Sequence, residues 1–560
     1  MSEQRSVVGS AKLIAICTLL SRITGLVRDV LLAQAFGLRW VQDAFVYAFQ
    51  IPNLFRRLLG EGAMAAVFVP SFTQCLERDG HEPAWRLLAR TLALLSVTLT
   101  VIVLVIEAVI LLVWILGPDD PEQAAARRLL LSLTALMLPF MLTICVVALL
   151  SAILNCVGSF VPAALAPILL NIAMIAAIAG VGPGLYPAQP AKQVYVIAVS
   201  VVVAGVLQIL FLRPVLRSCG VKLGWRWEPS DPAVKRMLRL LVPVALGQGV
   251  LAFGVYLDAQ ICILLTHEAG APERIGWLGG AVAYPLEEGA LSAVTYAQRL
   301  YQFPLGVLVI SLATAAMPAF SRQAARGNWP AWSAEVRRTL RLAIFEGLLT
   351  GAVMMILAEP IIRLLFEYRR FTPAHTARAA YVLIFYGVAM WAYCAQHIVL
   401  RGYYSLGDVW TPLKISAAVL PLNVVLTLTM VWFDGIREAA FAISSAITFS
   451  LSVVVGLVLL RRRAPVKLLD RSTLAALTRM LIAAGVTVAA LAALRPVVAP
   501  LVSAIPWTLP SRAVETLGLL SVGSGVYLLA AKLLGLEEIG LLLGRMRERI
   551  RGGRGDSGGD

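Results

Sequence analysis

Residues 12–36 (KLIAICTLLSRITGLVRDVLLAQAF) and 44–70 (AFVYAFQIPNLFRRLLGEGAMAAVFVP) decide the class of this chain. Each stretch is long and apolar enough to span a bilayer, which takes about 20 residues. Both nevertheless carry charged residues inside the apolar run. An arginine at the bilayer centre costs about 2.5–3.5 kcal/mol on insertion scales, so such residues usually face a cavity or a partner. The two stretches therefore predict either an internal site for an anionic cargo or an elaborate internal network of salt bridges.

The whole chain of 560 residues is 59% hydrophobic and 14% charged, whereas soluble domains carry about 25% charged residues. This composition indicates an all-α, polytopic membrane protein. The net charge of +16 would suggest nucleic acid as a partner of a soluble protein. Here Lys and Arg in cytoplasmic loops explain it, so we expect no nucleic-acid partner. We predict about fourteen transmembrane helices, at 12–36, 42–75, 88–116, 129–157, 161–181, 193–213, 237–266, 290–320, 335–359, 374–400, 411–433, 437–460, 472–495 and 513–536.

The distribution of Lys and Arg predicts that both termini are cytoplasmic. Cations gather in the segments 213–239, 321–341 and 461–479, which alternate with an acidic loop at 267–290 that should lie outside. One segment disagrees with this orientation. The loop 360–380 should face outward, yet it contains several arginines (Arg363, Arg369, Arg370 and Arg378).

An internal repeat relates the two halves of the chain at a shift of about 248 residues. VFVPSFTQCLERDG at 67–80 resembles AAMPAFSRQAARGN at 315–328. The repeat equates the first six helices with the next six in the same orientation, which is typical of transporters built from parallel repeats. We predict an N-lobe, a C-lobe, an added helix pair and a basic, Gly-rich, disordered tail, over residues 1–220, 221–465, 466–540 and 541–560.

Polar residues in three predicted helices recur at helical spacing and so share faces. Arg57 and Glu61 lie four residues apart and can neutralise each other. Pro52 lacks a backbone N–H and should bend the second helix beside them. The stripes in the first, second and eighth helices contain Arg22, Asp29, Asn53, Arg56, Ser292 and Arg299, and Arg28 lies on an adjacent face of the first helix.

The recurrence of arginine in these stripes favours a phosphate-bearing cargo. A guanidinium stays charged at any working pH and offers a planar fork of donors to phosphate oxygens. The alternative is that the arginines only form ion pairs with Asp29, Asp43 and Glu61.

A second candidate site is an ion site around Asp258, because a carboxylate inside a membrane helix is an ion or proton site by default. Asn423, Thr427 and Ser444 can add the oxygen ligands that hard cations prefer. The alternative is an Asp258 carboxylate that only accepts hydrogen bonds from helix hydroxyls. The seven cysteines show no paired spacing and are expected to be small core residues.

SRITGLVRDVLLAQAFG (21–37) and DAFVYAFQIPNLFRRLLGEGAMAAVFVPSF (43–72) resemble the N-terminal signature of the MurJ (MviN) lipid II flippase family. YAQRLYQFPLGVLVISLATAAMPAFSR (296–322) is similar to the eighth-helix segment of the same family. The resemblance implies the multidrug/oligosaccharidyl-lipid/polysaccharide (MOP) exporter fold, in which two six-helix lobes surround a cationic cavity. It also implies that the last two helices line a hydrophobic groove for a polyprenyl tail.

The resemblance also implies roles for particular residues. Asp43 and Glu61 match acidic positions tied to gating, and Gln298 and Gln302 stand where the family often has an acid. A carboxylate expected on the eleventh helix is Thr427 here, which departs from the family's sodium site. The cavity residues would be Arg22, Arg28, Arg56, Ser292 and Arg299, and the sodium ligands would be Asp258, Asn423, Thr427 and Ser444.

The implied function is a flippase for lipid II, the undecaprenyl-pyrophosphate-linked peptidoglycan precursor, in the bacterial inner membrane. Alternating access would carry the head group to the outer leaflet for cell-wall synthesis, without covalent chemistry and so not as an enzyme. Expected partners are lipid II, membrane lipids and other cell-wall synthesis proteins; no cofactor is expected beyond a sodium ion or the membrane potential. The alternative is a flippase for another polyprenyl-linked saccharide. A multidrug antiporter is disfavoured because arginines repel organic cations, and a polyprenyl-phosphate enzyme because no acidic metal-binding motif is found.

Overall fold

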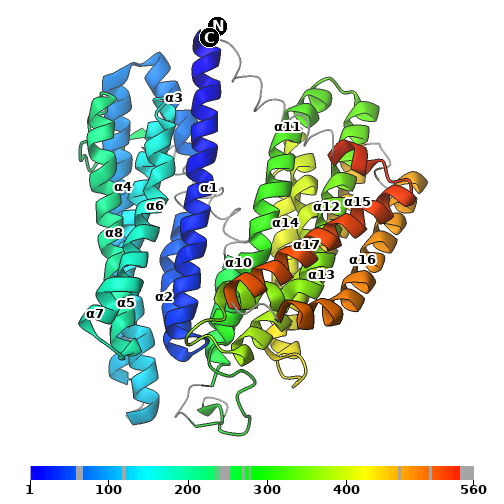
Figure 1. The fold of residues 1–560 in the computed structure, drawn as a ribbon. Helices are drawn as coiled ribbons and strands as arrows, with labels where there is room; N and C mark the ends of the chain where they lie inside the picture. Colours follow the sequence, from blue (N-terminus) through cyan, green and yellow to red (C-terminus); the bar gives the residue numbers. More distant parts are fainter. Residues whose placement is uncertain are drawn as a thin grey trace, which may run out of the picture. The chain divides into compact units, whose positions relative to one another are not determined.

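A computed structural model of the chain shows an α-helical protein in two units (Figure 1). It describes residues 2–58, 67–116, 121–232, 234–235, 239, 253–267, 272–276, 279–464, 468, 470–503 and 508–542. Within these residues extended backbone pairing occurs only as isolated bridges in the segment before residue 290. The all-α class predicted from the composition is therefore confirmed.

The first unit comprises Met1–Ser292 together with Tyr368–Phe371. Its described helices include one at Phe253–Leu264. The others are α1 (Ser2–Phe36), α2 (Trp40–Phe55), α3 (Val69–Arg78), α4 (His81–Leu116), α5 (Pro121–Cys156), α6 (Phe160–Ala176), the π-helix η2 (Ala177–Val181), α7 (Gly182–Leu185) and α8 (Pro190–Ser218).

The second unit comprises Ala293–Glu367 and Thr372–Asp560. The helix α10 begins in the first unit and continues into this one. The described elements are α10 (Ala290–Pro304), the π-helix η4 (Leu305–Val309), α11 (Ile310–Ala325), α12 (Trp329–Phe366), α13 (Pro373–Ser405), α14 (Trp410–Met430), the 3₁₀-helix η5 (Arg437–Ala439), α15 (Ala440–Arg463), α16 (Arg471–Ser503) and α17 (Thr508–Leu533).

Eleven described helices are long and apolar enough to cross a membrane. They match eleven of the fourteen predicted spans in order. The predicted span 12–36 lies within α1, while 42–75 and 237–266 are described only in part. The total of fourteen therefore stays a prediction, as do the lobe boundaries at 220 and 465 and the separate status of 466–540. The tail beyond residue 542 lies outside the described residues.

In the first unit, the core forms where α5 packs against α2, α4 and α8, and α1 runs along α6. Buried apolar side chains from these helices make one continuous cluster. A Cβ atom on Gly205 of α8 would lie 2.1 Å from the Thr143 hydroxyl of α5. The absence of a side chain at Gly205 thus permits the close approach of two membrane helices.

In the second unit, α12 and α13 form the central pair and lie side by side. A Cβ atom on Gly351 would lie 2.4 Å from the carbonyl oxygen of Gly387, so small residues again set the helix separation. Around this pair, large side chains such as Trp332, Phe345 and Tyr386 are almost fully buried.

The predicted internal repeat has structural counterparts in both units. Phe72 of α3 and Phe320 of α11 are both completely buried. α2 contains Pro52 and continues as a π-helical turn at 56–58, and α10 ends at Pro304 and continues as η4. A proline that removes one backbone donor is a common cause of such irregular turns. The bend predicted at Pro52 therefore has a counterpart in the second half.

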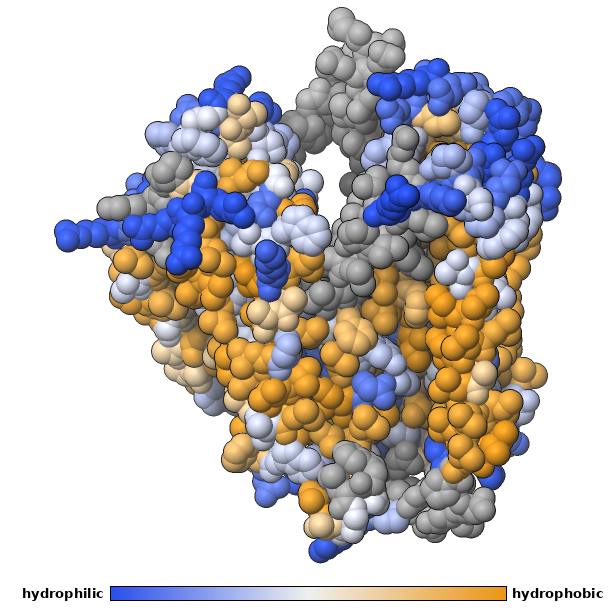
Figure 2. Space-filling view, turned by 180° about the vertical axis from the view of Figure 1, so that it is seen from behind, coloured by the Kyte–Doolittle hydropathy of each residue, from blue (hydrophilic) through white to orange (hydrophobic). Residues whose placement is uncertain are grey.

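On the face shown in Figure 2, apolar residues form a broad middle band and hydrophilic residues gather above and below it. On α4, Leu104 is 62% exposed and Leu111 is 59% exposed. Such continuous apolar cover is expected of helices that contact lipid rather than water. The protein is a multi-pass membrane protein.

The arginines that disagree with the predicted orientation include two that are ion-paired. Arg363 pairs with Glu359 one helical turn away, and Arg378 Nε lies 2.8 Å from Glu438 Oε1. Glu359 and Glu438, which lie outside the loop 360–380, thus balance the charge of two of its arginines.

Candidate functional site

Arg28 in the C-terminal third of α1 is held by two side chains. Its Nε and Nη2 atoms donate to Asp29 Oδ1 at 2.9 and 2.6 Å. Its Nη1 donates to Asn171 Oδ1 of α6 at 2.9 Å. Arg28 and Asp29 are each 8% exposed, and Asn171 is 6% exposed. Arg28 and Asp29 therefore form a buried polar cluster with Asn171 inside the first unit.

Asn171 links this cluster back to the backbone of α1. Its Nδ2 atom donates to the carbonyl of Ser21 at 3.2 Å and to the hydroxyl of Thr24 at 3.1 Å. Both ends of the amide are thus used, so its orientation is determined. Asn171 was not among the site residues predicted from the sequence. The available signal was that α6 (FVPAALAPILLNIAMIA) contains no other polar side chain.

A second polar group lies on α2 beside the same cluster. Arg56 Nε donates to Asn53 Oδ1 at 3.2 Å, and Asn53 Nδ2 donates to the carbonyl of Phe49 at 2.8 Å. The Phe49 ring centroid lies 5.9 Å from Arg28 Cζ, within range of a cation–π contact. Phe49 therefore connects the arginine of α1 with the predicted polar stripe of α2.

Three further predicted arginines are exposed. Arg22 lies on α1, Arg57 lies in the π-helical turn after α2, and Arg299 lies on α10 in the second unit. The predicted pairing of Arg57 with Glu61 is not tested, because Glu61 lies outside the described residues.

Asp43 of α2 holds the beginning of α10. Its Oδ2 accepts from the backbone N–H of Gly289 at 2.7 Å, and its Oδ1 accepts from the backbone N–H and the hydroxyl of Ser292 at 2.8 and 2.5 Å. Trp40 N–H also donates to Glu288 at 3.3 Å. A carboxylate is well suited to this place, because the first turn of a helix has unpaired N–H groups and a positive dipole end.

This contact gives Ser292 a different role from the predicted one. We expected Ser292 to face the cargo, but its side chain is completely buried and its hydroxyl donates to Asp43. In the described conformation Ser292 therefore helps to anchor α10. Whether it also contacts cargo stays a prediction.

The predicted sodium ligands belong to both units. Thr427 and Ser444 share a hydrogen bond of 2.7 Å between α14 and α15, and Thr448 donates to Asn423 Oδ1 at 3.2 Å. All four side chains are buried. Asp258 belongs to the first unit, so the complete ligand set stays a prediction. The oxygen atoms present are of the type that binds sodium.

The described residues show no gathering of three or more His, Cys, Asp or Glu side chains at a metal site. All seven cysteines are unbridged, and Cys17, Cys145, Cys262 and Cys394 are buried. The expectation of cysteines as small core residues is confirmed for these four.

The arrangement around Arg28 can bind an anion. A guanidinium has five N–H donors, and the contacts to Asp29 and Asn171 engage one N–H on each of its three nitrogens. The contacts fix the plane of the guanidinium while leaving it further donors. A charged hydrogen bond from these donors is stronger in a buried setting than in water, but the Asp29 carboxylate already balances the charge of Arg28.

A family model and a curated relative carry the same family description. The family model described as lipid II flippase MurJ matches residues 32–514. A probable lipid II flippase MurJ of Rhizobium tropici is 32% identical over 80% of this chain and 79% of its own length.

The fold resembles two solved transporter structures. A lipid II flippase MurJ in the inward closed conformation aligns with a TM-score of 0.66 and 20% identity, over 93% of this chain and 98% of that one. An inward-facing multidrug resistance MATE family transporter of the MOP superfamily aligns with a TM-score of 0.62 and 16% identity, over 81% and 98%. The fold class predicted from the resemblance is confirmed.

Proposed function

The chain belongs to the lipid II flippase MurJ family, and we propose that it moves lipid II from the cytoplasmic to the outer leaflet of the bacterial inner membrane. The cargo would be the undecaprenyl-pyrophosphate-linked peptidoglycan precursor. Translocation rearranges no covalent bond of the cargo, so the protein acts as a transporter and not as an enzyme.

The observation that carries the chemical part of this proposal is the buried, oriented guanidinium of Arg28. Arg56, directly after α2, donates to Asn53, and Asn53 donates to the carbonyl of Phe49, whose ring lies 5.9 Å from Arg28 Cζ. A pyrophosphate offers several oxygens to planar donor forks of this kind. We assign pyrophosphate binding to Arg28 and Arg56, with further contacts from Arg22, Asn53 and Arg299.

The energetic problem of flipping is the transfer of a charged head group through the bilayer. Removing polar and charged groups from water is costly unless new partners replace the water. An arginine already held in place, as Arg28 is by Asp29 and Asn171, loses little freedom when it binds the pyrophosphate. The tail stays in the lipid phase, and the protein opens alternately to the two sides of the membrane.

The remaining assignments concern gating and coupling. Asp43, through its contacts with Gly289 and Ser292, is assigned to the control of α10, and Arg57 and Glu61 to a charge pair. Sodium is proposed to bind at Asp258, Asn423, Thr427 and Ser444, with the membrane potential as the other energy source. Both termini are assigned to the cytoplasm, and other cell-wall synthesis proteins are proposed as partners.

The test is transport of fluorescent lipid II in proteoliposomes, together with growth of bacteria depleted of their own lipid II flippase. We expect the wild-type chain to support both. Arg28→Ala and Arg56→Ala should each reduce transport by at least about tenfold, because a charged hydrogen bond contributes about 1.5–3 kcal/mol. Arg326→Ala, which removes an exposed cation at the end of α11, is the matched control.

Transport of another polyprenyl-linked saccharide, but not of lipid II, would establish the alternative cargo. Transport that survives the Arg28→Ala change, at equal expression, would keep the function but refute the assigned anion site. The amount of each variant in the membrane is measured beside growth and vesicle transport. A folding defect is then recognised as a loss of protein from the membrane.

A further inference from the structure

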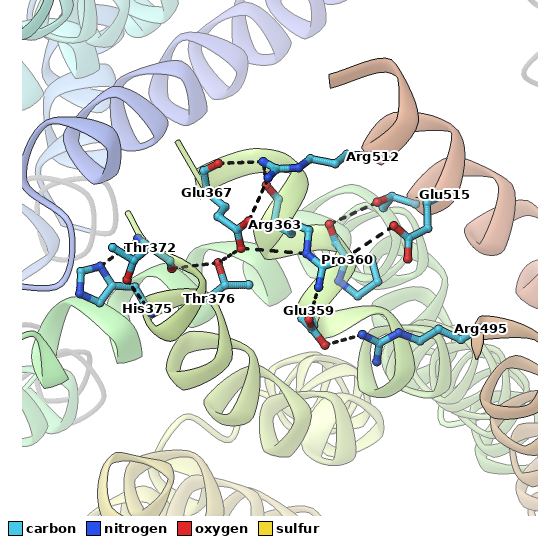
Figure 3. Close-up of polar contacts among 11 residues, drawn as sticks. Glu359, Pro360, Arg363, Glu367, Thr372, His375, Thr376, Arg495, Arg512 and Glu515 are labelled. Carbon is cyan, nitrogen blue, oxygen red and sulfur yellow. Dashed lines mark hydrogen bonds and ion pairs between the residues drawn. The ribbon is translucent and has the colours of Figure 1, made fainter. Parts of the chain in front are cut away.

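The C-terminal helices α16 and α17 are joined to the end of α12 by a compact group of charged side chains (Figure 3). Three are carboxylates and three are guanidiniums. We term them the charged cluster: Glu359, Arg363 and Glu367 of α12 and its C-terminal cap, Arg495 of α16, and Arg512 and Glu515 of α17.

Glu359 lies between two arginines from different helices. It accepts from Arg363 on its own helix and from Arg495 on α16. The Glu359 side chain is 37% exposed, and each arginine is 31% exposed. This part of the charged cluster is therefore partly exposed at the surface of the second unit.

Arg512 of α17 caps the C-terminal end of α12. Its Nη2 donates to Glu367 Oε1 at 2.9 Å, and its Nη1 donates to the carbonyls of Glu367 and Arg363 at 2.7 and 3.4 Å. A cation at a helix C-terminus interacts favourably with the helix dipole and satisfies carbonyls that have no partner in the helix. Thr376 of α13 also donates to Glu367, at 2.6 Å.

The attachment continues along the rest of α12. Val353 and Leu357 of α12 share a buried apolar cluster with Leu491 of α16 and Leu519 of α17. The Tyr527 hydroxyl of α17 donates to the carbonyl of Phe345 at 3.1 Å.

Two ion pairs hold the other end of the helix pair. Arg337 of α12 pairs with Asp470 before α16, and Arg341 pairs with Glu538 after α17 at 2.5 Å. The helices α16 and α17 are thus attached to α12 near both of its ends and along its middle.

We propose that Arg495 and Arg512 are positioning residues for transport, which keep α16 and α17 fixed to α12 throughout the cycle. The helix pair then moves with the second unit as one body. This inference rests on the proposed lipid II transport, because it concerns how the membrane-facing helices accompany the moving part of the flippase. Neither arginine needs to contact cargo for this role.

The decisive experiment replaces the Glu359–Arg495 ion pair by a link that can be made and broken. The variant Glu359→Cys/Arg495→Cys is prepared in a background without the seven native cysteines. Its thiols are left free or are bridged by a short bifunctional methanethiosulfonate. Single-cysteine variants treated with the same reagent are the controls.

We expect the unbridged variant to transport fluorescent lipid II at least about threefold more slowly than its background, since contacting residues in one network are energetically coupled. Bridging should restore transport. A loss of lipid II transport on bridging would overturn the proposal, because it would mean that α16 has to separate from α12 during transport. Full activity without the bridge would overturn it as well.

A distance measurement separates this proposal from the proposed function. Spin labels are placed at Val388 of α13 and Leu517 of α17, which are 46% and 56% exposed. We expect one narrow distance that does not change when lipid II is added, and a broadened one in Arg495→Ala/Arg512→Ala. A wild-type distance that changes with cargo would refute rigid attachment. If the wild type transports no lipid II, the proposed function fails, while the label distance in cargo-free protein still tests the attachment.

Discussion

At the scale of single residues, Arg28 shows what a charged side chain inside a membrane helix requires. The sequence predicted an anion-binding arginine and, as the alternative, a simple ion pair with Asp29. The structure shows the pair and adds Asn171, which holds a third nitrogen of the same guanidinium. These interpretations are compatible, because an arginine with five donors can be oriented by two partners and still bind an anion.

Asn171 was missed because its importance depends on a contact across 143 positions of sequence. The spacing of Arg22, Asp29 and Arg56 along their helices was sufficient to group these residues on faces. Spacing within one helix does not say which other helix supplies a partner. The pairing of α1 with α6 is set by packing of apolar surfaces, which many alternative arrangements of apolar helices would also satisfy.

The first prediction concerns Asp43, whose carboxylate accepts three hydrogen bonds at the start of α10. In Asp43→Asn one oxygen becomes an NH₂ group that faces N–H donors, and the charge is lost. We expect the free energy of unfolding to fall by about 1–3 kcal/mol and transport to fall with it. Thermal unfolding of the purified protein measures the first effect.

The control for this prediction is Asp434→Asn, because Asp434 lies exposed in the turn before η5. That change should leave the unfolding temperature within experimental error. Equal shifts for the two variants would contradict the assigned role of Asp43.

At the scale of elements, the entry into α10 depends on one glycine. Gly289 has a φ of +86°, and a Cβ atom there would lie 2.5 Å from the backbone of Leu38. Gly289→Ala should therefore incur both the strain of a left-handed backbone and a steric overlap. We expect Gly289→Ala to lower the free energy of unfolding by at least about 1 kcal/mol more than an alanine substitution at a glycine that has a positive φ but open space around it.

Gly279→Ala is the matched comparison, since Gly279 has a φ of +70° and a Cβ atom added there would have no atom within 4 Å. Chemical or thermal unfolding of both variants gives the difference. A Gly279 variant that is as unstable as the Gly289 variant would show that backbone strain alone explains the loss.

The beginning of α16 provides a prediction about pH. Hydrogen bonds from the backbone N–H of Thr473 and from the hydroxyl of Ser472 hold the pKa of Asp470 well below its usual range. A carboxyl whose folded pKa is depressed stabilises the fold above its unfolded pKa of about 3.9, and this contribution is lost as the pH falls toward the folded pKa.

We expect Asp470→Ala to destabilise the protein at pH 5–8 by about 0.5–2 kcal/mol, the usual cost of losing an N-cap. The difference from wild type should shrink below about pH 4. Unfolding temperatures across this pH series test both parts, with Asp434→Ala as the control. A difference that persists unchanged at the lowest pH would mean that the carboxylate charge is not involved.

Most elements were predictable because membrane helices are recognised by composition alone. Long apolar runs located eleven helices in the correct order, and the repeat paired Phe72 with Phe320, which are equally buried. The π-helical turns after Pro52 and before Ile310 were not predicted in detail. A proline indicates a distortion, but neighbouring side chains decide whether the backbone kinks or widens.

At the scale of the whole molecule, the orientation in the membrane is testable without a transport assay. We expect a cysteine at Trp225, which is 58% exposed after α8, to react with a membrane-impermeant thiol reagent only from the cytoplasmic side. A cysteine at exposed Glu273 should react only from outside. The reason is the concentration of cations in the segment 213–239.

Labelling of intact cells and of inside-out vesicles compares the two sides directly, in a background without accessible native cysteines. Reaction of both positions from one side would contradict the alternation of the helices. If the cysteine at position 225 reacted only from outside and the one at position 273 only from the cytoplasm, the two termini would lie outside the cell.

The charged cluster has an electrical consequence. Its three carboxylates and three guanidiniums sum to zero, whereas each uncompensated charge that crosses the membrane field involves about 2.3 kcal/mol per 100 mV. The helices α12, α16 and α17 can therefore shift together with no electrical work from these six side chains. Removal of one arginine, as in Arg495→Ala, would leave an unbalanced carboxylate and convert a voltage-insensitive attachment into a gating charge.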